Sequence, residues 1–236
     1  MTIHLTRSNP VTEERFLNRT EAGRSLAGAL LERGEGFDFI LALARGGIPV
    51  AVSVARALSL PLFPMVVRKI GLPGHRELAL GALSEGGSLF WNQELIERHG
   101  IRESELSILR EKARKEVNDR VARLRSGRPL PPMEGKNILI VDDGVATGAT
   151  LFAAVLEVRR HNPNRVMVAL PVAPPEIVRQ FRKEGISSLI LIVPHHFQAV
   201  GEWYEEFSEV SDGEVLLAMN QLSRDNAPDW PPPGQA

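Results

Sequence analysis

Two adjacent carboxylates and a short loop of threonine, glycine and alanine follow one apolar run of this chain. Asp142 and Asp143 come directly after the run at 138–141, and the loop then opens a predicted helix. Backbone amides at a helix N-terminus favour a phosphate group, and glycine lets the backbone come close to it. The carboxylates suit hydroxyl groups or a cation instead. This combination indicates a ligand that carries both kinds of group, such as a phosphorylated sugar. The loop residues are Ala146, Thr147, Gly148, Ala149 and Thr150.

A second stretch repeats this pattern. A predicted strand over 37–44 ends at Ala44, Arg45, Gly46 and Gly47, and a predicted helix over 48–58 follows. The Arg45 guanidinium can bind phosphate oxygens through two hydrogen bonds. Taken alone, the stretch could also be an ordinary strand–helix turn with a surface arginine. Two anion sites at neighbouring strand ends would suit a ligand with two phosphate groups.

Composition and missing motifs narrow the classes of protein. The 236 residues contain 28 Lys and Arg against 29 Asp and Glu, and no cysteine. The balanced charge argues against a nucleic-acid partner, and the missing cysteine excludes a disulfide framework. The sequence carries neither a P-loop nor a G-x-G-x-x-G fingerprint. It shows no signal peptide and no apolar run long enough for a membrane span, so we expect a cytoplasmic protein without a membrane partner.

Alternating strands and helices predict an α/β fold: a doubly wound parallel sheet flanked by helices. We expect one domain over 1–224 with a small helical insert at about 92–128, and a disordered Pro-rich tail at 225–236. Residues 71–87 are predicted to form a long, glycine-rich loop, with or without a hairpin. The predicted strands cover 37–44, 62–67, 137–141, 166–172 and 189–193, and the predicted helices cover 13–33, 48–58, 103–125, 149–160 and 176–184.

The run of four apolar residues, two acidic residues, a short spacer and Thr-Gly resembles the signature of the type I phosphoribosyltransferases. The resemblance spans about residues 16–216. It implies a substrate, 5-phosphoribosyl 1-pyrophosphate (PRPP), bound with Mg²⁺, and transfer of its phosphoribosyl group to a nitrogen nucleophile. By this resemblance the loop 146–150 binds the 5′-phosphate, and 44–47 binds pyrophosphate around a non-proline cis peptide bond. Asp142 and Asp143 would hold the ribose hydroxyls, directly or through the metal.

Arg68 and Lys69, followed by Leu72-Pro73-Gly74, resemble the start of the mobile loop in the adenine enzymes and, less closely, in the orotate enzymes. The resemblance implies that both cations approach pyrophosphate, with Arg45 and Lys69 assisting catalysis, and that 71–87 closes over the site. The 6-oxopurine members usually carry an acidic residue just before Thr-Gly. Here that position is Ala146, which speaks against a hypoxanthine or guanine substrate without establishing adenine.

The acceptor side is marked only by aromatic residues. Phe197 is the candidate to stack on an acceptor base, with Trp203 or Tyr204 as alternatives, but these rings could equally pack the C-terminal segment onto the core. A regulator that binds PRPP without turnover, and a hydrolase with the same sugar-phosphate site, are alternative functions. Dimers are common in the family, so a homodimer is possible. The acceptor itself stays open.

Overall fold

The computed structural model describes residues 15–225, apart from the side chains of 75–77 and 223–225. Within this range seven strands form one sheet in the order β4-β3-β2-β1-β5-β6-β7. Five neighbouring strands, from β2 to β7 across the sheet, run parallel, and β3 and β4 are antiparallel. The predicted α/β class is confirmed. The strands are β1 (Phe39–Ala44), β2 (Leu62–Leu72), β3 (His75–Ser84), β4 (Leu89–Trp91), β5 (Asn137–Val141), β6 (Arg165–Val172) and β7 (Ser187–Ile192).

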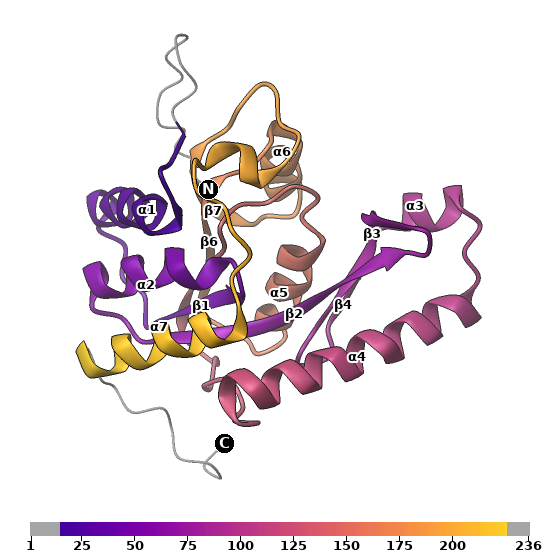
Figure 1. Ribbon diagram of the computed structural model, residues 1–236, viewed down its shortest axis with the longest axis horizontal. Coiled ribbons are helices and arrows are strands. Elements are labelled where there is room, and N and C mark those ends of the chain that lie inside the picture. The colour runs from indigo at the N-terminus through magenta and orange to yellow at the C-terminus, as the bar shows by residue number, and fades with distance from the viewer. Residues whose placement is uncertain (1–14, 226–236) are drawn as a thin grey trace.

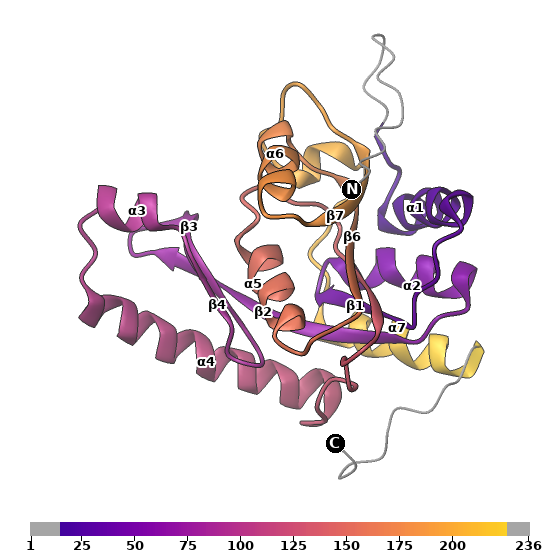
Figure 2. The ribbon, with the colours of Figure 1, turned by 180° about the vertical axis from the view of Figure 1, so that it is seen from behind.

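Helices cover both faces of the sheet (Figures 1 and 2). α1, α2 and α7 lie on one face, while α5 and α6 lie on the other. The long α4 runs beneath β2 and β3 and reaches α7. The helices are α1 (Arg19–Arg33), α2 (Gly47–Leu58), α3 (Gln93–Arg98), α4 (Glu103–Arg125), α5 (Ala149–Arg159), α6 (Pro175–Lys183) and α7 (Asp212–Asp225), with a short 3₁₀ turn at Val200–Trp203. No helix among residues 15–225 is both long and apolar enough to span a membrane.

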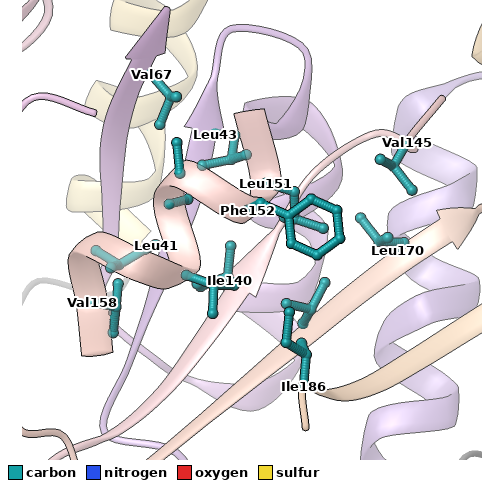
Figure 3. Close-up of a cluster of buried hydrophobic side chains, with 14 of the residues drawn as sticks. Leu41, Leu43, Val67, Ile140, Val145, Leu151, Phe152, Val158, Leu170 and Ile186 are labelled. Carbon is teal, nitrogen blue, oxygen red and sulfur yellow. The ribbon is translucent and has the colours of Figure 1, made fainter. Parts of the chain in front are cut away.

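Each central strand contributes to two cores because successive side chains point to opposite faces of a sheet. Leu41 and Ile140 belong to one buried cluster with Phe152 and Val158 of α5 (Figure 3). Their neighbours Ile40 and Leu139 pack on the other face, against α1 and α2. Burial on both faces explains why these strands are continuously apolar rather than alternating.

The strand order reverses at β1. β2 lies beside β1 on one side, and β5, which comes later in the chain, lies beside β1 on the other side. β1 and β5 pair in parallel, with Ala42 opposite Val141. Their carboxyl ends therefore lie together, and open α/β sheets bind ligands at such a switch point. The two polar stretches found in the sequence follow these two strands.

Helix and strand boundaries confirm some predictions and correct others. α4 and β5 have the predicted bounds. The first helix begins at Arg19 and not at residue 13, because the Asn18 side chain accepts a hydrogen bond from Glu21 N and caps it. Phe16 instead forms a bridge with Tyr204. α7 was not predicted, and it contains residue 225; the rest of the predicted tail lies outside the described residues.

The predicted loop at 71–87 is mostly a hairpin. β2 continues past its predicted end at residue 67 to Leu72, and β3 returns antiparallel to it. Gly81 is needed there for close packing, since a Cβ atom would lie 2.5 Å from a ring carbon of Trp91. The hairpin also has its own apolar contacts with α3 and α4, through Leu80 and Leu106. The hairpin alternative was therefore the correct one.

Two buried carboxylates hold the turn between β3 and β4. Glu85 pairs with Arg125 of α4 at 2.7 Å and accepts a hydrogen bond from Val66 N. Glu157 of α5 accepts hydrogen bonds from Ser84 Oγ at 2.7 Å and Ser88 N at 3.0 Å. Burial acts to raise the pKa of Glu157, but these bonds outweigh it and hold the pKa below its usual value. The turn thus joins the hairpin to helices on both faces of the sheet.

We expect Glu157→Ala to lower the free energy of unfolding by about 2–4 kcal/mol, because it leaves buried donors of Ser84 and Ser88 without an acceptor. Thermal unfolding followed by circular dichroism measures the change. Glu32→Ala, an exposed substitution on α1, is the matched control and should stay within about 0.5 kcal/mol of the wild type. A Glu157→Ala protein as stable as this control would contradict the assigned role of the carboxylate.

Candidate active site

The loops after β1 and β5 touch through glycines that leave no room for a side chain. A Cβ atom on Gly46 would lie 2.2 Å from Asp143 Oδ2, and one on Gly47 would lie 3.0 Å from Asp142 Oδ1. The peptide bond between Ala44 and Arg45 is cis, as the resemblance implied. The two loops therefore form a single site at the switch point, with the carboxylates between them.

The start of α5 presents free backbone amides. Gly148 precedes the helix with a positive φ of 76°, and no side chain of the described residues caps it. A Cβ atom on Gly148 would lie 2.5 Å from the Phe152 ring, so the position needs glycine on steric grounds as well. Ala146 and Thr147 are exposed. An uncapped N-terminus with no acidic residue in its first turn can bind an anion.

Arg19 of α1 holds the second carboxylate. Its Nε donates to Asp143 Oδ2 at 2.8 Å, and its Nη1 donates to the carbonyl oxygen of Ser208 at 2.8 Å. The side chains of Arg19 and Asp143 are only 10% and 13% exposed. The guanidinium also stacks over the Phe207 ring, 3.8 Å from its centroid. Because the pair is shielded from water, it fixes the orientation of Asp143.

Burial raises the pKa of both aspartates. For Asp142 the negative charge of Asp143 adds to the effect of burial, so its pKa lies well above the usual value. For Asp143 burial also raises the pKa, and Arg19 opposes it. Asp142 Oδ1 accepts a hydrogen bond from Asp143 N at 2.9 Å. Two carboxylates this close, with one cation, are suited to a ligand that brings positive charge or hydroxyl donors.

The aromatic residues behind the site form a packed cluster. Tyr204 donates a hydrogen bond to the carbonyl oxygen of Asp143 at 2.5 Å and stacks on Phe207. Burial, and then the charge of Asp143, raise the pKa of Tyr204. Trp203 is 3% exposed, and Phe197 is half-buried against the same cluster. Tyr204 thus holds the loop at Asp143, and the acceptor-binding role stays a prediction for Phe197, Trp203 and Tyr204.

Two of the three predicted pyrophosphate-binding cations, Arg68 and Lys69, lie on opposite faces of the hairpin. Arg45 forms ion pairs with Glu209 and, at 3.8 Å, with Asp212. Arg68 pairs with Glu116 of α4. Arg68 and Lys69 are consecutive residues within β2, not at a strand end, so their side chains leave opposite faces of the hairpin.

The carboxylates of the site fit a metal only in part. Among the described residues, no group of three or more His, Asp or Glu side chains could hold a metal ion. Asp142 and Asp143 offer two carboxylates, one of which is bound to Arg19. Mg²⁺ commonly takes one or two carboxylates and completes its shell with water and substrate phosphate oxygens. The donor set therefore fits a Mg²⁺ ion that arrives with the substrate.

Reasoning from the sequence missed Arg19. The residue falls in a stretch predicted as an amphipathic helix, 124 positions before Asp143. The one local signal is an arginine at the start of a helix whose following turns are apolar, and that pattern is common on surfaces. Only the packing of α1 against the sheet brings the guanidinium to the site.

Both loops lie within a domain of the phosphoribosyltransferase class. A family model described as "Phosphoribosyl transferase domain" matches residues 14–198. The chain belongs to this family, a family of pentosyltransferases, which confirms the predicted resemblance.

Named relatives agree with this assignment. Two proteins from two strains of Mycobacterium tuberculosis, H37Rv and CDC 1551, are each 38% identical over 212 residues. They are named "Putative phosphoribosyl transferase" Rv0571c and MT0597. The alignment covers 90% of this chain but 48% of theirs, so the chain spans about half the length of these relatives. The crystal structure of TT1426 from Thermus thermophilus is 40% identical, with a TM-score of 0.73, over 88% of this chain and 99% of that one.

The raised pKa of Asp142 has a consequence for stability. An unfolded aspartate titrates near pH 4. Between that value and the raised pKa, the folded protein binds more protons than the unfolded chain, so stability falls as the pH rises. Above the raised pKa the fold carries the full cost of a buried charge beside Asp143.

We therefore expect Asp142→Asn to raise the free energy of unfolding at pH 8 by about 1–3 kcal/mol, with the gain shrinking toward pH 4. The amide oxygen can still accept from Asp143 N. Thermal unfolding at both pH values measures the effect, and Asp119→Asn on the exposed side of α4 is the control for loss of one charge. Equal midpoints for Asp142→Asn and the wild type at pH 8 would contradict a raised pKa.

Proposed function

We propose that the protein binds PRPP with Mg²⁺ and transfers its 5-phosphoribosyl group to a nitrogenous acceptor, with release of pyrophosphate. The observation that carries the proposal is the contact between the loops after β1 and β5. Their glycines Gly46 and Gly47 press against Asp143 and Asp142. Sites for two phosphate groups thus flank a pair of carboxylates, in the order that PRPP presents pyrophosphate, ribose hydroxyls and 5′-phosphate.

In this reaction a nitrogen lone pair forms a bond to C1 of the ribose, and the bond from C1 to the pyrophosphate oxygen breaks. The bonding electrons leave with pyrophosphate, and the proton of the acceptor nitrogen passes to solvent. Asp142 and Asp143 accept hydrogen bonds from the ribose hydroxyls. Their negative charge also favours the positive charge that develops on the sugar ring. Arg19 and Tyr204, which hold Asp143, act as positioning residues.

The phosphate groups are bound at the two ends of the site. The amides of 146–150 at the start of α5 bind the 5′-phosphate. Ala44–Gly47, which include Arg45, bind pyrophosphate, and Arg68 approaches it from β2, whereas the Lys69 side chain leaves the other face of the hairpin. When bound, Mg²⁺ neutralises negative charge on the leaving group, and Asp142 and Asp143 are the residues that would hold it.

The acceptor lies on the side of Phe197, whose half-buried ring is available for stacking. Ala146 stands where an acidic residue would face a 6-oxopurine, so we favour a different acceptor. A cytoplasmic location and a homodimer stay predictions.

Calorimetric titration of PRPP with Mg²⁺ tests the proposal. We expect saturable binding, weakened about tenfold by Thr147→Ala, because the variant loses a hydrogen bond to a charged phosphate. Thr147 is exposed, so this variant should fold normally. Thr20→Ala, an exposed threonine on α1, is the control and should bind like the wild type. Asp143→Asn should also weaken binding.

A panel of nitrogenous acceptors, scored by pyrophosphate release, then measures turnover. Acceptor-dependent release supports a transferase. Release of ribose phosphate without any acceptor would assign a hydrolase instead, and binding with no turnover on any acceptor would favour a regulator. No binding of PRPP at millimolar concentration would overturn the proposal.

A further inference from the structure

Four arginines gather where β2, α4 and the loop after β1 approach one another. Arg68 comes from β2, Arg45 from the loop, and Arg120 and Arg123 from α4. Burial lowers the pKa of Arg120, and the charges of Arg45, Arg68 and Arg123 lower it further, against the opposing charge of Asp212. A cavity of about 200 Å³ lies between β2 and α4, and its charged lining consists of Arg68, Arg120 and Arg123 with the carboxylates Glu116 and Asp119. Arg68 is paired with Glu116, whereas Arg45, Arg120 and Arg123 all face Asp212 at the start of α7. Guanidinium groups arranged in this way can bind the oxygens of a phosphate anion through paired hydrogen bonds.

Two carboxylates near the start of α7 form ion pairs with these arginines. Asp212 lies 2.8 Å from Arg123 Nε, 3.8 Å from Arg45 Nη1 and 4.0 Å from Arg120 Nε. Glu209 pairs with Arg45, although its own side chain is 82% exposed. α7 is thereby held against α2 and α4. The carboxylates come from the C-terminal segment and not from either ligand-binding loop.

The fit between these carboxylates and the arginines is incomplete. Arg120 Nε and Asp212 Oδ1 are both buried without a hydrogen-bond partner within residues 15–225. Their separation of 4.0 Å allows attraction but no hydrogen bond. Each guanidinium has five N–H donors, whereas two carboxylates offer four oxygens to three arginines. A ligand with more oxygens and more charge would satisfy the cluster better.

We infer that Arg120 and Arg123 extend the site of Arg45 into a binding site for the pyrophosphate group of the substrate, and that Glu209 and Asp212 occupy it until that group displaces them. The inference rests on the proposed function for the identity of the ligand. Arg45 belongs to both sites, because Gly46 beside it touches Asp143. The carboxylates near the start of α7 thus act as an internal competitor for the leaving group.

Titration of inorganic pyrophosphate with Mg²⁺ into the full chain tests this inference without any turnover. Arg120→Gln should weaken binding about tenfold or more, because it removes a charge-assisted contact. Lys112→Gln removes the same charge from an exposed position of α4 and should change binding less than about twofold. Glu209→Gln should strengthen binding about two- to fivefold, as expected for removal of an exposed competing ion pair. Glu206→Gln, exposed on the same segment, is its control.

An Arg120→Gln protein that binds pyrophosphate as well as Lys112→Gln does, with an unchanged thermal midpoint, would overturn the inference. If Glu209→Gln and Glu206→Gln bind pyrophosphate with equal affinity, Glu209 does not compete with it. Failure here differs from failure of the proposed function. PRPP binding that depends on Thr147 but not on Arg120 would leave the function standing and reject the extended site. Pyrophosphate binding that depends on Arg120, in a protein that binds no PRPP, would support the extended site and reject the proposed function.

Discussion

The packing of Gly46 and Gly47 against two aspartates is the constraint on which the candidate site depends. With no Cβ atoms, the backbone after β1 comes close enough to place its loop beside the loop after β5. Because β1 and β5 pair in parallel, their carboxyl ends lie at the same edge of the sheet. Because the two strands are neighbours, the loops that follow them lie side by side. Arg19 offsets the charge of the Asp143 carboxylate, and Tyr204 holds the same residue by its backbone carbonyl oxygen.

This arrangement places destabilising charge where chemistry would use it. Burial of Asp142 next to Asp143 works against folding at neutral pH, and the apolar layers on both faces of the sheet offset that cost. The arginine cluster also carries a cost in folding free energy, because like charges from β2 and α4 approach one another there. A protein selected for stability alone would have neither group, so each is better explained by a charged ligand.

Local signals in the sequence were enough for the central fold. The bounds of α4 follow from an apolar stripe between clear helix ends, and β5 follows from an apolar run ended by two aspartates. The other features depend on contacts between residues far apart in the sequence, and these could not be predicted from local patterns. Phe16 fits the helical period of α1, yet its pairing with Tyr204 keeps it outside the helix. Gly81 suggested a loop, although it serves close contact with Trp91. Arg19 and Glu209 reach the site only through tertiary packing, which no local pattern reports.

The long helix α4 contacts both the hairpin and the C-terminal helix. Glu116 holds Arg68 on the hairpin, and one turn later Arg120 faces Asp212 of α7. Residues four apart are neighbours on the same face of a helix. The hairpin and the C-terminal helix are therefore both tied by ion pairs to one stretch of α4, although their own residues lie more than 100 positions apart in the sequence.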